Sequence, residues 1–202
     1  PACLQPVSGR ESLWVEIALL LDERQPKTRA DKTSDELCLR KTAVAPGRDD
    51  ALWACGEIYS ADDTTVALFE SLGLEIPFIL NNSAFGALAK FNLCRQFDVV
   101  AAIEVLSKVE GDRLERAWQQ SRLPLAQLFE WFENRRPQVV GDKDVRKRFG
   151  ALPLFPSSGK LRPLEALVLP GGFDDPLGLA ELVDLTALGG RQEFLRELGM
   201  RA

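Results

Sequence analysis

The sequence contains no histidine, and it has only one methionine and one tyrosine among 202 residues. Without histidine, the chain lacks a serine–histidine–aspartate triad, a cysteine–histidine pair and any histidine-containing zinc site. The cysteines are few and lie apart: Cys3, Cys38, Cys55 and Cys94 form no C-x-x-C motif and no second pair at metal-finger spacing. We expect them to be reduced, mostly buried thiols in a cytoplasmic protein.

Long apolar runs are also missing. The longest uninterrupted ones cover residues 17–21 and 99–103, far short of the about 20 residues that span a bilayer. The first residues include neither an initiator methionine nor a basic segment leading into an apolar one, so a signal peptide is not expected. The sequence therefore predicts no membrane partner, and we expect a compact fragment of a longer polypeptide.

The composition that remains is that of an ordinary globular domain, with 46% hydrophobic and 27% charged residues and a net charge of −5. A chain of this length buries roughly 70% of the surface of its unfolded form, enough for one substantial core or two small ones. The hydrophobic pattern predicts four segments. They are an N-terminal helix and loop (1–36), a first hairpin-helix unit (37–80), a helical region (81–149) and a second hairpin-helix unit (150–202). The N-terminal helix is expected over 12–24. In the helical region, breaks are expected near Gly111 and Pro124, and a separate helix is expected over 143–149.

One order of elements recurs along the chain. Residues 42–72 and 151–185 each contain an extended segment, a turn, a second extended segment, an acidic pair and a short apolar helix. This recurrence predicts an α+β fold in which two strand-turn-strand-helix units flank a helical bundle region. Duplication of one element and a chance match between mixed folds both stay open.

Two short patterns resemble catalytic motifs. Ser157-Ser158-Gly159-Lys160 matches S-x-x-K, which needs a helix to bring its lysine to its serine. Gly159 and the prolines nearby favour a hairpin turn instead. The same segment has leucines where a phosphate loop needs its first glycine and its magnesium-binding hydroxyl. We therefore predict no catalytic residue and no nucleotide site.

Acidic pairs occur at Asp49-Asp50, Asp62-Asp63 and Asp174-Asp175. Converging carboxylates can bind magnesium or divide acid and base roles between them. Each pair, however, precedes a helix or occupies a turn, where aspartate caps free amide groups. Capping is the preferred interpretation, so no metal and no cofactor are expected in this segment. A magnesium-dependent hydrolase or nucleotidyl-transfer domain that uses the pairs is the alternative function.

A basic strip stands out against the acidic background. It consists of Arg135, Arg136, Lys143, Arg146, Lys147 and Arg148. Only Asp142 and Asp144 oppose these six charges, so the strip could dock on an acidic partner or another domain of the same polypeptide. No stacking aromatic side chains are interleaved with it, so nucleic acid is not the expected partner. A solvated helix face and a nucleic-acid accessory domain are the other interpretations.

A family resemblance rests on the second hairpin-helix unit. Its segments are Leu152-Pro-Leu-Phe-Pro-Ser-Ser-Gly-Lys-Leu-Arg-Pro-Leu164, Val168-Leu-Pro-Gly-Gly-Phe173 and Phe194-Leu-Arg-Glu-Leu-Gly199. They resemble the repeat of sacsin and of bacterial proteins with a sacsin-type ATP-binding domain, in which an L-P-x-F strand, a turn ending in glycine, a second strand and an F-L-x-x-L-G helix recur. The resemblance is best over residues 145–200 and weaker over 37–80.

The resemblance implies a large, Hsp90-related, chaperone-like protein whose separate ATPase domain does the nucleotide work. This chain has neither the D-x-G-x-G motif nor the glycine-rich lid of that domain, so no nucleotide-binding residue carries over. The implied function is a non-catalytic interaction, client-binding or scaffold module. Its expected partners are other domains of the same polypeptide and extended or unfolded protein clients.

Overall fold

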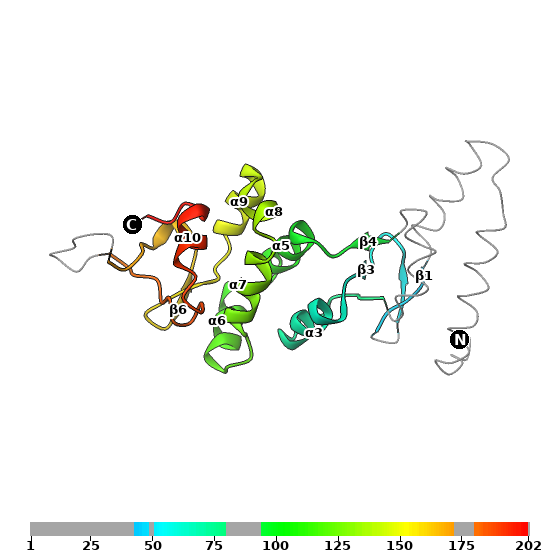
Figure 1. The fold of residues 1–202 in the computed structure, drawn as a ribbon. Coiled ribbons are helices and arrows are strands. Elements are labelled where there is room, and N and C mark those ends of the chain that lie inside the picture. The colour runs from blue at the N-terminus through cyan, green and yellow to red at the C-terminus, as the bar shows by residue number, and fades with distance from the viewer. Residues whose placement is uncertain (1–42, 49–50, 80–93, 172–179, 202) are drawn as a thin grey trace. The chain divides into compact units, whose positions relative to one another are not determined.

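The computed structural model describes residues 43–48, 51–79, 94–171 and 180–201 (Figure 1). The chain divides into two compact units. The N-terminal unit comprises residues 1–62 and 75–97, and the helical unit comprises residues 63–74 and 98–202. Helices and small sheets are both present, so the general α+β prediction is confirmed. The predicted helix over 12–24 lies outside the described residues.

The N-terminal unit contains the first predicted hairpin. Strand β1 (Ala43–Pro46) pairs antiparallel with β2 (Leu52–Ala54), and Ala45 lies opposite Trp53. The Gly47 N–H donates to the Ala51 carbonyl at 2.9 Å, at the turn that the sequence predicts between the two strands.

A second, parallel pair completes the described part of this unit. Strand β3 (Tyr59–Ser60) pairs with β4 (Arg95–Gln96), with Tyr59 opposite Arg95. Phe97, immediately after β4, places its ring edge-on to those of Tyr59 and Phe78, with centroids 5.4 Å and 5.1 Å away. Such edge-to-face contacts add to the burial of apolar area, so these rings form a small aromatic core.

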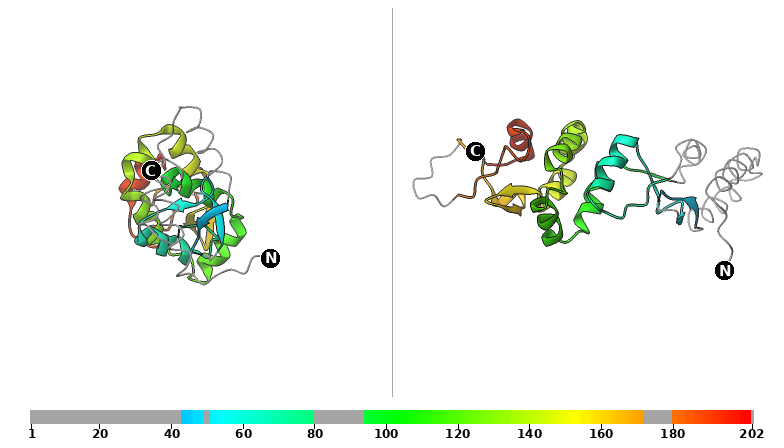
Figure 2. Two further views of the ribbon diagram at one scale, coloured as in Figure 1. Left: turned by 90° about the vertical axis from the view of Figure 1, so that its right-hand side faces the viewer. Right: turned by 90° about the horizontal axis from the view of Figure 1, so that it is seen from below.

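The helical unit consists largely of short helices (Figures 1 and 2). Their bounds are α3 (Asp63–Ser71), α5 (Val99–Ser107), α6 (Gly111–Gln119), α7 (Leu125–Glu133), α8 (Arg136–Val140) and α9 (Lys143–Gly150). The breaks expected near Gly111 and Pro124 are confirmed, as is the separate helix predicted over 143–149. No helix among the described residues has the length and apolar character needed to cross a membrane.

The side chains of two aspartates, Asp98 and Asp142, cap the starts of helices in this unit. The Asp98 carboxylate accepts the Ala101 N–H at 2.9 Å, and the Asp142 carboxylate accepts those of Asp144 and Val145 at 2.8 and 3.1 Å. These bonds satisfy amide groups that the first helical turn leaves without a partner. Capping by aspartate therefore occurs here, at positions other than the acidic pairs for which it was predicted.

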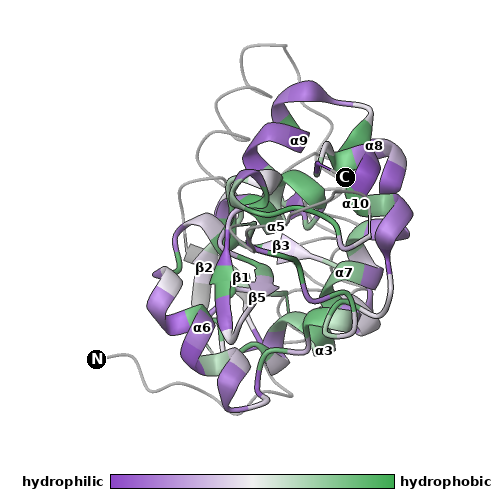
Figure 3. Cartoon of the chain, turned by 90° about the vertical axis from the view of Figure 1, so that its left-hand side faces the viewer, coloured by the Kyte–Doolittle hydropathy of each residue, from purple (hydrophilic) through white to green (hydrophobic). Residues whose placement is uncertain are grey.

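Phe149 of α9 lies at the centre of the core of the helical unit. Its ring centroid is 4.4 Å from that of Phe132, 5.8 Å from those of Phe129 and Phe155, and 6.4 Å from that of Phe194. All five rings are fully buried. The opposite side of α9 is basic, and the helix is coloured mostly as hydrophilic in Figure 3. One aromatic side chain thus joins α7 and α9 to strand β5 (Phe155–Ser157) and helix α10 (Gln192–Leu198).

The second predicted hairpin is confirmed. Strands β5 (Phe155–Ser157) and β6 (Lys160–Arg162) pair antiparallel, with Ser157 opposite Lys160. The two turn residues have positive φ, 47° at Ser158 and 78° at Gly159, as a tight two-residue hairpin requires. Among the described residues, the buried Ser157 hydroxyl has no hydrogen-bond partner, and Lys160 is exposed. Ser157 and Lys160 are opposite each other on paired strands and are not one helical turn apart, the arrangement that S-x-x-K needs.

The chain after β6 passes through a short 3₁₀ helix (Leu164–Ala166) and ends in helix α10 (Gln192–Leu198). Helix α10 packs against α8 (Figures 1 and 2). Gly199 terminates it with a φ of 98°, a left-handed conformation that glycine adopts without strain. The final glycine of the F-L-x-x-L-G motif is thus a helix cap. At the other end of α10, Arg191 forms an ion pair with Glu133 of α7 at 2.9 Å.

The predicted arrangement of two matching units is not confirmed. Helix α3 follows β3 as expected, but it belongs to the helical unit. The Trp131 indole N–H of α7 donates to the Thr65 hydroxyl at 2.8 Å, and the Phe69 and Trp131 rings lie 5.2 Å apart. In the C-terminal part, the next α-helix after β6 is α10, and the residues around the second acidic pair lie outside the described ranges.

Replacement of Phe149 by alanine is expected to lower the free energy of unfolding by about 3–5 kcal/mol, because it leaves a cavity among four aromatic rings. Urea unfolding followed by tryptophan fluorescence measures this loss. The matched control is Lys147→Ala on the exposed side of the same helix, with an expected change within about 0.5 kcal/mol. Equal effects of the two substitutions would show that the aromatic cluster does not hold the helical unit together.

Candidate functional site

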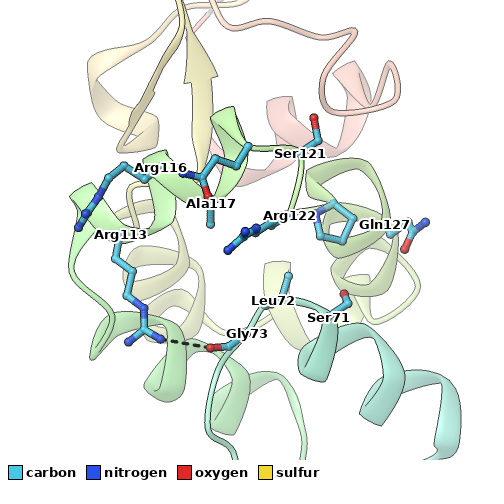
Figure 4. A pocket seen from close by; sticks show the side chains of 11 residues that line it. Ser71, Leu72, Gly73, Arg113, Arg116, Ala117, Ser121, Arg122 and Gln127 are labelled. Atoms are coloured by element: carbon cyan, nitrogen blue, oxygen red, sulfur yellow. Dashed lines mark hydrogen bonds between the residues drawn. The ribbon is translucent and has the colours of Figure 1, made fainter.

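A cavity of about 700 Å³ opens on the surface of the helical unit (Figure 4). Helix α6 and the chain that leads from it to α7 supply most of its lining, and the end of α3 and Gln127 of α7 supply the rest. The lining residues are Ser71, Leu72, Gly73, Arg113, Arg116, Ala117, Gln120, Ser121, Arg122, Pro124 and Gln127. We call this cavity the arginine pocket, because its charged lining residues are all arginines.

Local structure brings the arginines together. Arg113 and Arg116 are three positions apart on α6 and so occupy neighbouring sites on its surface. Leu114, between them, is buried and fixes which side of the helix faces the solvent. The chain then turns through Ser121, whose φ is 57°, and places Arg122 at the pocket.

The three guanidinium groups differ in their hydrogen bonding. One Nη of Arg113 donates to the Gly73 carbonyl at 3.2 Å, which fixes that side chain against the end of α3 (Figure 4). The Nε of Arg116 donates to the Asp112 carbonyl at 3.1 Å. The Arg122 side chain lies centrally in the view of Figure 4, and no side-chain hydrogen bond or ion pair to another described residue holds it.

The lining carries positive charge without a carboxylate to neutralise it. Each guanidinium has five N–H donors, so the bonds to Gly73 and Asp112 leave most of the donor capacity of this pocket unused. Serine and glutamine side chains add neutral donors around the arginines. The arrangement can therefore bind a carboxylate or phosphate group, which guanidinium groups bind through paired hydrogen bonds.

A second cavity of about 390 Å³ adjoins the arginine pocket, because Ser71 and Gln127 line both. It is more apolar in character and lies between α3 and α7. Its other lining residues are Thr64, Ala67, Leu68, Glu130, Trp131 and Asn134. A ligand in the arginine pocket would thus find a partly apolar surface beside it.

The structure describes all six residues of the basic strip. Two of them, Arg135 and Arg136, bind other residues of the helical unit, and the other four lie on α9. The Arg135 guanidinium lies 4.0 Å from the centre of the Trp131 ring and donates to the Trp131 carbonyl at 3.3 Å. Arg136 binds the Glu197 carboxylate of α10 through both Nε and Nη. These two arginines stabilise the helical unit internally.

The other four residues of the strip lie on α9. Lys143, Lys147 and Arg148 are exposed and Arg146 is half-buried, while Val145 and Phe149 of the same helix face the core. No ion pair to another described residue involves the four. They form a basic surface on the outer side of α9.

The acidic pairs form no metal site in the described part of the chain. Asp62 and Asp63 are both exposed, and no group of three acidic or cysteine side chains there is arranged to hold a metal ion. The pairs at 49–50 and 174–175 lie outside the described residues.

The sequence did not reveal the arginine pocket. Asp112 and Glu115 alternate with Arg113 and Arg116, so the local charge sums to almost nothing and no basic cluster stands out. The available signal was the spacing of three residues along a helix, which places the two arginines together and Glu115 at another angle. Asp112 lies four positions before Arg116 and so neighbours it on the helix surface, but it is not among the lining residues. Glu115 is in fact used elsewhere, since its carboxylate accepts the Leu161 N–H at 3.0 Å.

Comparison of the chain with protein-family models, with curated proteins and with solved structures finds no significant match.

The ion pair between Arg136 and Glu197 predicts a change in the pKa of the Glu197 carboxyl that a titration can measure. Hydrogen bonding to the Arg136 guanidinium lowers the pKa of the Glu197 carboxyl below its ordinary value. Its contribution to stability is therefore present above the pKa of the unfolded chain and is lost as the pH falls through the lower folded pKa. The contribution is small because both side chains are on the surface.

NMR titration of the Glu197 carboxyl carbon is expected to give a lowered midpoint that returns to the ordinary range in Arg136→Gln. Lys143→Gln removes a positive charge that does not contact Glu197, and it should leave the midpoint almost unchanged. Identical midpoints in the parent protein and in Arg136→Gln would contradict the pairing.

Proposed function

We propose that this chain is a non-catalytic interaction module that binds an acidic segment of a protein partner in the arginine pocket. The observation that carries the proposal is the presence of three guanidinium groups, and no carboxylate, in the lining of one cavity. The rest of the chain is net acidic, so this concentration of positive charge is local. A local site of this kind favours an acidic partner by electrostatic complementarity.

A polypeptide fits the surroundings of the pocket better than a nucleic acid does. No aromatic side chain is among the described residues that line the arginine pocket, so these residues offer a base no ring on which to stack. The adjoining cavity offers Ala67, Leu68 and Trp131 to an apolar side chain. An extended segment with acidic residues followed by an apolar one can use both cavities.

The resemblance of residues 145–200 to sacsin-type repeats supports the same class of function. It implies a place in a chaperone-like, multidomain cytoplasmic protein, where the acidic segment belongs either to a client or to another domain of the same polypeptide. The basic surface on α9 is a second place where such a segment could dock, and the experiment below separates the two surfaces.

The test is fluorescence anisotropy with a labelled peptide of several glutamates followed by leucine. Arg122→Gln is expected to weaken binding about tenfold, because a charge-assisted hydrogen bond to a carboxylate contributes about 1.5–3 kcal/mol. The measurement is repeated at low and physiological salt, and a peptide with glutamine in place of each glutamate should bind far more weakly.

Arg148→Gln is the matched control, since it removes the same charge from the outer side of α9. It should change the affinity by less than twofold. Weaker binding in Arg148→Gln but not in Arg122→Gln would move the site to α9. No binding of the glutamate peptide to the parent protein at either salt concentration would refute the proposal.

A further inference from the structure

Two cysteines that are far apart in the sequence, Cys55 and Cys94, lie in the segments that lead into two paired parallel strands of the N-terminal unit. Cys55 begins the turn after β2, in which the Glu57 N–H donates to the Ala54 carbonyl at 2.9 Å, and the chain then enters β3. Cys94 directly precedes β4. Because β3 and β4 are parallel, the residues that lead into them lie at the same end of the pair.

Backbone hydrogen bonding extends this contact toward the cysteines. The Arg95 N–H donates to the carbonyl of Ile58 at 3.3 Å, and Ile58 directly precedes Tyr59, the partner of Arg95 in the strand pair. The chain next to Cys94 is thereby fixed against the end of the turn that contains Cys55.

The two thiols interact directly. Both are free, and the Cys94 S–H donates a hydrogen bond to the Cys55 sulfur. This bond stabilises a thiolate at Cys55 and lowers its pKa, while it raises the pKa of Cys94, the donor. Cys55 is completely buried, whereas Cys94 is partly exposed. The pair thus contains one sulfur within reach of a small reagent and one protected sulfur beside it.

We propose that Cys55 and Cys94 are an oxidisable pair that forms an intramolecular disulfide in reaction with a small-molecule disulfide such as oxidised glutathione. The pair first loses one proton to solvent, and the proton that remains passes from Cys94 to Cys55 along their hydrogen bond. The exposed Cys94 sulfur, now a thiolate, attacks one glutathione sulfur and releases one glutathione thiolate. The Cys55 sulfur, deprotonated in turn, displaces the second glutathione thiolate from Cys94. In total, two protein thiols and one oxidised glutathione give one protein disulfide and two glutathione thiols.

The new bond would link the turn after β2 to the start of β4. It would close a loop that contains β3, α3 and the chain that returns to the N-terminal unit, and it would restrict the unfolded chain accordingly. Both cysteines belong to the N-terminal unit, whereas the arginine pocket belongs to the helical unit. The inference therefore does not depend on the proposed function.

The experiment uses the full chain with Cys3→Ser and Cys38→Ser, so that only the pair remains. The protein is incubated with oxidised glutathione, and its intact mass is measured before and after reduction. The expected result is a loss of the mass of two hydrogens, protection of both thiols from alkylation, and a cross-linked peptide that contains Cys55 and Cys94. Dithiothreitol should reverse all three.

Two further variants test the order of the steps. Cys55→Ser should stop at a stable glutathione adduct on Cys94, because the second nucleophile is gone. Cys94→Ser should resist modification while folded, because the remaining thiol is buried. Circular dichroism verifies that each variant folds. Full alkylation of both thiols after oxidation, or a glutathione adduct that persists on Cys94 while Cys55 is present, would overturn the proposal.

Discussion

Burial of Phe149 is the constraint on which the helical unit depends. The ring contacts aromatic side chains of α7, β5 and α10, so one residue of α9 joins elements that are far apart in the sequence. An aromatic ring carries a large apolar area and prefers tilted or edge-on neighbours, which fixes orientation as well as distance. The outer side of α9 can remain basic because Phe149 and Val145 attach the other side to the core.

The arginine pocket is a consequence of how α6 is held. Leu114 packs inward, and the Glu115 carboxylate accepts a backbone N–H from β6. Arg113 and Arg116 are thereby directed to the solvent side, where the end of α3 supplies a carbonyl for Arg113. The Glu115 carboxylate, which balances one of these charges in sequence, is engaged elsewhere, and the Asp112 carboxylate is not part of the lining. A neutral stretch of sequence thus becomes a positively charged surface.

Much of the local structure was predictable from the residues. The break at Pro124, the helix over 143–149 and the hairpin around Gly159 all follow from local sequence, because turn residues and apolar spacing act over a few positions. Long-range contacts were not predictable in this way. Thr65 accepts a hydrogen bond from Trp131, which moves α3 from the predicted first unit to the helical unit, and nothing near Thr65 in sequence indicates that partner.

The sequence by itself determined the α+β class, the lack of histidine chemistry and the positions of turns and helix breaks, since composition and short-range sterics decide these. Only the tertiary structure decided which arginine side chains are used in contacts inside the protein and which stay available to a binding partner. It paired Arg136 of the basic strip with Glu197, stacked Arg135 on Trp131 and grouped Arg122 with two arginines of α6. It also brought Cys94 to Cys55. The physical reason is that contacts between distant residues depend on how whole elements pack, which no local pattern of residues specifies.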